Sequence, residues 1–224
     1  SPSNPTILKS FKQWWRGASA PTDQAALIAW CEASGFAMRG IREQEGFVIE
    51  TGQPGLEGRI EWGPSQRHYL GEHELRLRGE IGLQPDAHAL VMPRGMIEAL
   101  EHELYHQFTG GVQTRLDEET PEEMRWLAMS PRLGAGLLGE LKAHYAGVSN
   151  LTPWLAHWLQ GALGERLLAQ AGQLPPFALI VQRGRLTLRV AMPGPDVASV
   201  QAAQALFAVA LEQARLAAQA ASEG

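Results

Sequence analysis

The stretch between Phe36 and Met92 consists of short runs in which apolar and polar residues alternate, separated by turns that contain Gly or Pro. In the clearest run, HELRLRGEI, Leu75, Leu77 and Ile81 recur on one side of an extended chain. A period of two is the geometry of a β-strand whose two faces meet different surroundings. Four or five such runs in succession predict an antiparallel meander with one apolar face that another element must cover. The other side of this run is expected to face water and carries Glu74, Arg76, Arg78 and Glu80.

The segment that follows, PRGMIEALEHELYHQF, has the spacing of an amphipathic helix. Its apolar residues Ile97, Leu100, Leu104 and Phe108 fall on one side when each residue turns the helix by about 100°. We therefore expect a helix over 94–108 that covers the apolar face of the meander.

Three sites in the second half place a hydroxyl residue before a proline: Thr120-Pro121, Ser130-Pro131 and Thr152-Pro153. A capping hydroxyl followed by proline at the first helical position is typical of a helix start. This pattern predicts a helix after Thr120 and further helices over about 131–146 and 153–171.

The segment PPFALIVQRGRLTLRV predicts a β-hairpin, because apolar residues alternate on both sides of Arg183-Gly184. Asp196 then provides an N-cap for an Ala-rich helix that runs to about Ala220. The small residues of this helix favour close packing on a sheet.

Together these segments predict a soluble α+β protein: an antiparallel β-meander covered by a central helix, a helical middle segment, then a β-hairpin and a long C-terminal helix. Residues 1–21 are expected to form a lead-in with a short aromatic helix, and residues 22–112 an α+β half. Residues 113–224 would add the helical segment, the hairpin and the C-terminal helix, packed with the first half as one unit.

Composition restricts the possible partners. The net charge is −5 and neither half of the chain has an excess of Lys and Arg, which argues against nucleic acid as the main partner. No apolar run is long enough to span a membrane.

Cys31 is the single cysteine, so the chain can form no internal disulfide and no cysteine-based zinc site. This usage favours the cytoplasm. The periplasm remains open, because the chain starts at Ser1 without a methionine and a chain of this length needs no disulfide.

One catalytic-looking motif, His102-Glu103-Leu104-Tyr105-His106, lies on the predicted central helix. Histidines four residues apart on a helix point the same way, as two zinc ligands require. This pentapeptide resembles the HExxH motif of the zincin metalloproteases. The resemblance implies His102 and His106 as zinc ligands and Glu103 as general base. It covers these five residues only and shows no third ligand; Glu140 downstream is the best candidate for that position.

The helical periodicity favours a different interpretation of the same motif. His102 and His106 lie almost opposite the apolar stripe formed by Ile97, Leu100 and Leu104, so a helix laid on a sheet would present both to solvent. We therefore expect both histidines to be unliganded and the protein to need no cofactor, with zinc as the alternative.

The leading hypothesis is a non-catalytic domain that binds a protein partner or a small apolar ligand, with homo-oligomerisation as a further possibility. Its candidate binding surface consists of Trp14, Trp15, Trp154 and Trp158, since aromatic side chains supply large contact areas. One alternative is a zinc-dependent metallohydrolase that uses the HELYH motif at 102–106. A second alternative is a structural subunit of a larger assembly.

Overall fold

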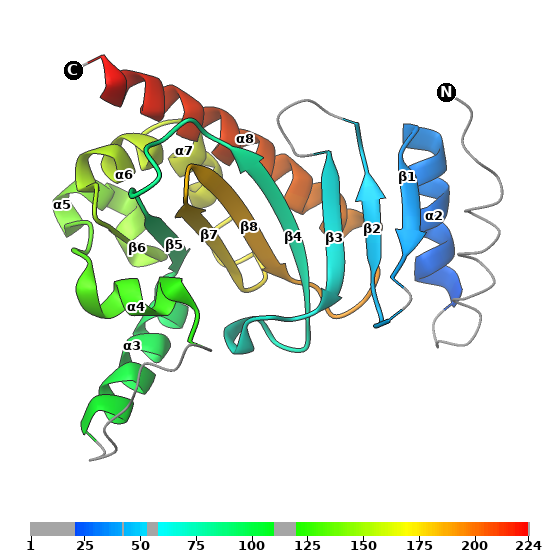
Figure 1. The fold of residues 1–224 in the computed structure, drawn as a ribbon, viewed down its shortest axis with the longest axis horizontal. Coiled ribbons are helices and arrows are strands. Elements are labelled where there is room, and N and C mark those ends of the chain that lie inside the picture. Colours follow the sequence, from blue (N-terminus) through cyan, green and yellow to red (C-terminus); the bar gives the residue numbers. More distant parts are fainter. Residues whose placement is uncertain (1–20, 42, 53–57, 110–119, 224) are drawn as a thin grey trace.

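The computed structural model describes residues 21–41, 43–52, 58–109 and 120–223, which form one antiparallel sheet with helices on both faces (Figure 1). The strands are β1 (Ala37–Gly40), β2 (Phe47–Glu50), β3 (Arg59–Pro64), β4 (His73–Glu80), β5 (Ala89–Pro93), β6 (Tyr145–Ser149), β7 (Phe177–Gln182) and β8 (Arg185–Ala191). The α-helices are α2 (Pro21–Ser34), α3 (Arg94–Thr109), α4 (Glu122–Met129), α5 (Ala135–Leu138), α6 (Thr152–Leu159), α7 (Ala162–Ala169) and α8 (Val197–Ser222). Two short 3₁₀ helices are η1 (His68–Leu70) and η2 (Gly139–Ala143). The α+β class with an antiparallel sheet and a long C-terminal helix is confirmed.

The strands lie in the order β1-β2-β3-β4-β8-β7-β5-β6, so the predicted meander holds for its first four strands. The hairpin of β7 and β8 lies between β4 and β5. Its two strands meet at Arg183-Gly184, where both residues have positive φ, as a tight hairpin turn requires. One sheet therefore contains strands from both halves of the chain.

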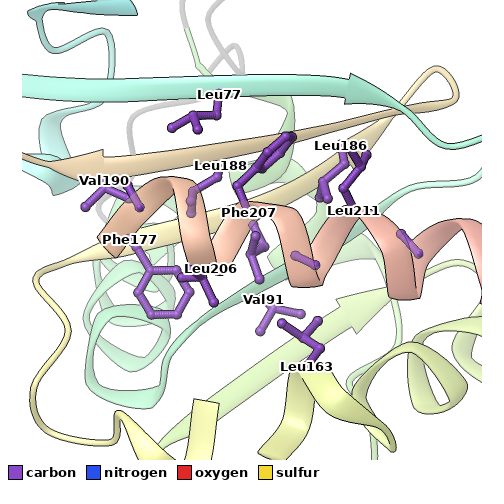
Figure 2. Packing of buried hydrophobic residues seen from close by; sticks show 14 of the residues in the cluster. Leu77, Val91, Leu163, Phe177, Leu186, Leu188, Val190, Leu206, Phe207 and Leu211 are labelled. Atoms are coloured by element: carbon purple, nitrogen blue, oxygen red, sulfur yellow. The ribbon is translucent and has the colours of Figure 1, made fainter. Parts of the chain in front are cut away.

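The first face of the sheet carries an uninterrupted row of large apolar side chains. Phe47 pairs with Trp62, Trp62 with Leu75, Leu75 with Val190, and Val190 with Phe177. Helices α2, α6, α7 and α8 contribute to the same core. Figure 2 shows this packing at α8, where Phe207, Leu206 and Leu211 lie beside Leu188 and Leu186 of β8.

The predicted cap of α8 is confirmed, because the Asp196 carboxylate accepts a hydrogen bond from the Ser199 backbone N–H at 2.9 Å. This helix contacts both β4 and β8. It therefore covers the apolar side of β4, a place that the sequence assigned to the central helix.

Helices α3 and α4 lie on the second face of the sheet, over β5 and β6. Ile97, Leu100 and Leu104 of α3 are buried there with Met124 and Trp126 of α4. These three residues of the predicted apolar stripe are thus buried as predicted, and the side chain of the fourth, Phe108, lies outside the described residues. The stripe covers a different part of the sheet because β5 lies beyond the inserted hairpin.

The prediction of a helix over 131–146 is wrong. Residues there form the short helix α5, the 3₁₀ helix η2 and the strand β6. Gly139 ends α5 with a φ of 56°, a conformation that costs glycine little. β6 is buried along its whole length and pairs with β5, so tertiary pairing overrides the local helix-start signal at Pro131. The expected helix over 153–171 is divided into α6 and α7 at residues 160–161.

Within the described ranges, no helix combines the length and the apolar character that crossing a membrane would require.

Candidate functional site

The histidines of the HELYH motif lie on the exposed side of α3. His102 and His106 are both exposed, whereas Leu104 between them is buried against the second face of the sheet. Figure 1 shows α3 running from the end of β5 away from the sheet, so that its C-terminal half projects from the body of the protein. The Nε2 atoms of His102 and His106 are 3.2 Å apart, and the ring centroids are 4.3 Å apart.

The side chain of Glu103 contacts a residue outside the HELYH motif. Its Oε2 atom lies 3.1 Å from Nε2 of His68, a residue of η1, and forms an ion pair with that ring when it is protonated. Glu140 is exposed on η2. Among the described residues, no three His, Cys, Asp or Glu side chains gather as a metal site.

Two of the four tryptophans proposed as a binding surface are core residues. Trp154 and Trp158 of α6 are 3% and 0% exposed, and their rings stack with centroids 5.0 Å apart. Trp158 also donates a hydrogen bond from Nε1 to the Ala210 carbonyl of α8 at 2.9 Å. These residues join α6 to α8 and offer no surface to a partner; Trp14 and Trp15 lie outside the described residues.

The polar side of β4 requires a correction, because part of it is buried. Glu74 is 0% exposed and Arg76 is 6% exposed, where the sequence predicts contact with water. Oε1 of Glu74 accepts hydrogen bonds from Arg76 Nη1 at 2.9 Å and from Arg189 Nη1 of β8 at 2.6 Å. The backbone N–H of Gln66 also donates to this oxygen at 3.2 Å. Opposite charges contributed by neighbouring strands thus permit the burial.

A second acidic side chain extends this ionic cluster to α4. Glu123, also buried, accepts hydrogen bonds from the Arg67 guanidinium and from the Tyr69 hydroxyl, the latter at 2.7 Å. Burial raises the pKa of Tyr69, and the Glu123 carboxylate adds to this rise. Burial lowers the pKa of Arg189, while the charge of Glu74 opposes that change. These contacts fasten α4 and η1 to the sheet, and the cluster has a structural role.

Within the described part of the chain, a cavity of about 330 Å³ lies on the first face of the sheet, beside the N-terminal half of α8. Six buried residues form its floor: Leu75, Phe177, Val190, Met192, Ala203 and Leu206. Concave sites with mainly apolar walls and few polar groups are typical places for small ligands.

The rim of this cavity is more polar and is open to solvent. Ala198 and Ala202 of α8 line it and are exposed, which shows that water reaches the cavity along this helix. Gln170, Gln173 and Ser199 also line it. The Oε1 atom of Gln170 is buried and accepts no hydrogen bond from the described residues. A buried acceptor without a donor is costly, and rotation of the Gln170 side chain toward the cavity would let the donor group of a ligand satisfy it.

The sequence did not point to this cavity. The small residues of the Ala-rich helix were interpreted as permitting close packing, yet near its N-terminus Ala198, Ala202 and Ala203 leave space above the sheet. A usable signal was the contrast within the helix, where alanines precede the larger Leu206 and Phe207.

Comparison of the chain with protein-family models, with curated proteins and with solved structures finds no match. Any proposal about function therefore rests on the geometry of this chain alone.

Proposed function

We propose that this protein binds a small, mainly apolar molecule that carries one hydrogen-bond donor, in the cavity between α8 and the sheet. The observation that carries the proposal is the apolar floor of the cavity, with Gln170, whose amide oxygen has no donor among the described residues, at its polar rim. The apolar body of the ligand would lie against Leu75, Val190 and Leu206. Its hydroxyl or amine would donate a hydrogen bond to Gln170.

The size of the cavity sets the expected affinity. A ligand that loses roughly 200 Å² of apolar surface to the cavity gains about 5 kcal/mol from burial. Part of this gain is lost with the translational and rotational freedom of the ligand. We therefore expect dissociation constants on the order of micromolar to millimolar for simple probes.

A fluorescent probe with this chemistry tests the location. N-phenyl-1-naphthylamine has an apolar body and a single N–H donor, and its emission rises in apolar surroundings. Ala202→Trp places a large ring at the cavity rim and is expected to weaken probe binding by about tenfold or more. Ala208→Trp is the matched control, because Ala208 is also exposed on α8 but does not line the cavity. Equal binding by both variants would place the probe elsewhere and overturn the proposal.

Gln170→Leu tests the proposed polar contact. This variant is expected to weaken binding of N-phenyl-1-naphthylamine about fivefold, because a hydrogen bond contributes about 1 kcal/mol. Binding of 1-benzylnaphthalene, which has no N–H, is expected to stay equal or to improve. If the variant weakens both molecules equally, Gln170 does not accept the donor of the ligand.

A further inference from the structure

The exposed histidine pair on α3 has a geometry that the ligand cavity does not explain. His102 and His106 lie on the exposed side of α3, which packs on the second face of the sheet, and the cavity lies on the first face. Both imidazoles are exposed, and their Nε2 atoms are 3.2 Å apart, within hydrogen-bonding distance of each other. Leu104, buried between them, holds this turn of α3 against α4 and the sheet.

This separation matches the bite of two imidazoles on one metal ion. With metal–nitrogen bonds of about 2.05 Å, two ligands are about 3.3 Å apart at the tetrahedral angle and about 2.9 Å apart at a right angle. The observed 3.2 Å lies between these values. The present separation of the two Nε2 atoms is therefore the one that a shared metal ion requires, and rotation of the exposed rings would direct both lone pairs to it.

We propose that His102 and His106 form a binding site for a divalent transition-metal ion. The helix supplies two neutral nitrogen ligands, and water completes the coordination. Nitrogen ligands of this kind follow the order Cu²⁺ above Ni²⁺ and Zn²⁺ in affinity. Binding weakens as pH falls, because a protonated imidazole has no lone pair for the metal.

The neighbouring groups separate this proposal from a HExxH hydrolase. Glu103 lies next to His102 in sequence but pairs with His68 at 3.1 Å. The only protein ligands of the proposed metal site are the two histidines, and Glu103 does not act as a base there. Glu103→Gln is accordingly expected to leave the metal affinity unchanged.

The test is titration of the untagged full chain with Cu²⁺. Isothermal titration calorimetry and the visible absorption of the bound ion measure the binding. We expect one strong site per chain, and His106→Ala is expected to weaken it by at least about tenfold, because the second ligand binds intramolecularly in the parent. His157→Ala is the matched control, since His157 is exposed on α6.

A relocated histidine keeps the number of histidines constant and tests the spacing. The double variant His106→Ala, Gln107→His has as many histidines as the parent, but its pair is five residues apart on the helix. It is expected to bind Cu²⁺ as weakly as His106→Ala. Parent-like affinity in His106→Ala or in the double variant would overturn the proposal, as would absence of a strong site in the parent. Circular dichroism of each variant verifies that α3 remains folded.

Discussion

The buried ionic cluster at β4 and β8 permits a sharp prediction about stability. Glu74→Gln keeps the shape of the side chain and removes its charge. Gln at this position can still accept hydrogen bonds from Arg76 and Arg189 through its Oε1 atom. These two guanidinium groups, whose side chains are 6% and 8% exposed, then lack the carboxylate between them.

The magnitude follows from the contacts that remain. Removal of one partner from a buried ion pair generally costs about 3–5 kcal/mol. Arg76 retains Glu61 at 3.5 Å and Arg189 retains the Gln66 amide oxygen at 3.4 Å. We therefore expect the lower end, about 3 kcal/mol, and a Tm lower by roughly 6–12 °C.

Glu80→Gln is the matched control for this prediction. Glu80 is on the same strand and pairs with Arg185 of β8 at 2.9 Å, but both side chains are exposed. Its loss is expected to cost less than about 1 kcal/mol. Urea denaturation followed by tryptophan fluorescence gives the free energy of unfolding for each variant.

A double-mutant cycle isolates the coupling between charges. Replacing both Glu74 and Arg189 with Leu removes the buried pair and is expected to cost less than Glu74→Leu alone. A loss below about 1 kcal/mol for Glu74→Gln would contradict the prediction, because it would mean that water already screens these arginines.

Three further outcomes are expected. Burial lowers the pKa of His88, with Glu122 opposing the change, so the unfolded chain binds a proton near pH 6.5 that the folded chain does not bind. The free energy of unfolding is therefore expected to fall between pH 7.5 and pH 5.5. Chemical denaturation at both pH values measures this fall, which His88→Gln is expected to reduce. Burial, with a smaller contribution from a neighbouring carboxylate, raises the pKa of Cys31 to about 12, so the thiol is expected not to react with a disulfide reagent at pH 8 until denaturant is added; rapid native labelling would contradict this. A Cβ at Gly164 would overlap with the Leu159 carbonyl oxygen, so Gly164→Ala is expected to cost about 2 kcal/mol in thermal denaturation, whereas Gly136→Ala, with nothing within 4 Å, is expected to be neutral or slightly stabilising.

Local sequence patterns predicted the helices and strands whose secondary structure depends on residues close in the sequence. Alternation in 73–81 and around Arg183-Gly184 identified β4 and the hairpin, and the Asp196 cap identified the start of α8. For the hairpin and the start of α8 the local preference and the tertiary environment agree, whereas for β4 the pattern identified the strand but not the burial of its polar side. Such agreement makes a pattern reliable.

Features that depend on distant residues were not predictable in the same way. Alternation placed Glu74 and Arg76 on a wet face, because Arg189 is 115 residues away from Glu74 in sequence. The helix start at Ser130-Pro131 predicted a helix to residue 146, whereas Tyr145–Ser149 form β6 and pair with β5. The cavity has the same origin, since it depends on how the N-terminal half of α8 meets the sheet.

For the HELYH motif, too, the sequence predicted what depends on nearby residues and missed a contact with a distant one. Helical spacing predicted correctly that His102 and His106 are exposed. The contact of Glu103 with His68 involves a residue 35 positions away and is not visible in the pattern.

Ligand binding in the cavity beside α8 can be observed residue by residue with methyl-resolved NMR during titration with N-phenyl-1-naphthylamine. We expect saturable shifts of the methyl signals of Leu75, Val190 and Met192, which line the cavity. The signals of Ile97 and Leu104, buried on the opposite face, are expected to remain in place. Unchanged cavity signals, or shifts centred on Ile97 and Leu104, would show that the proposed function is wrong.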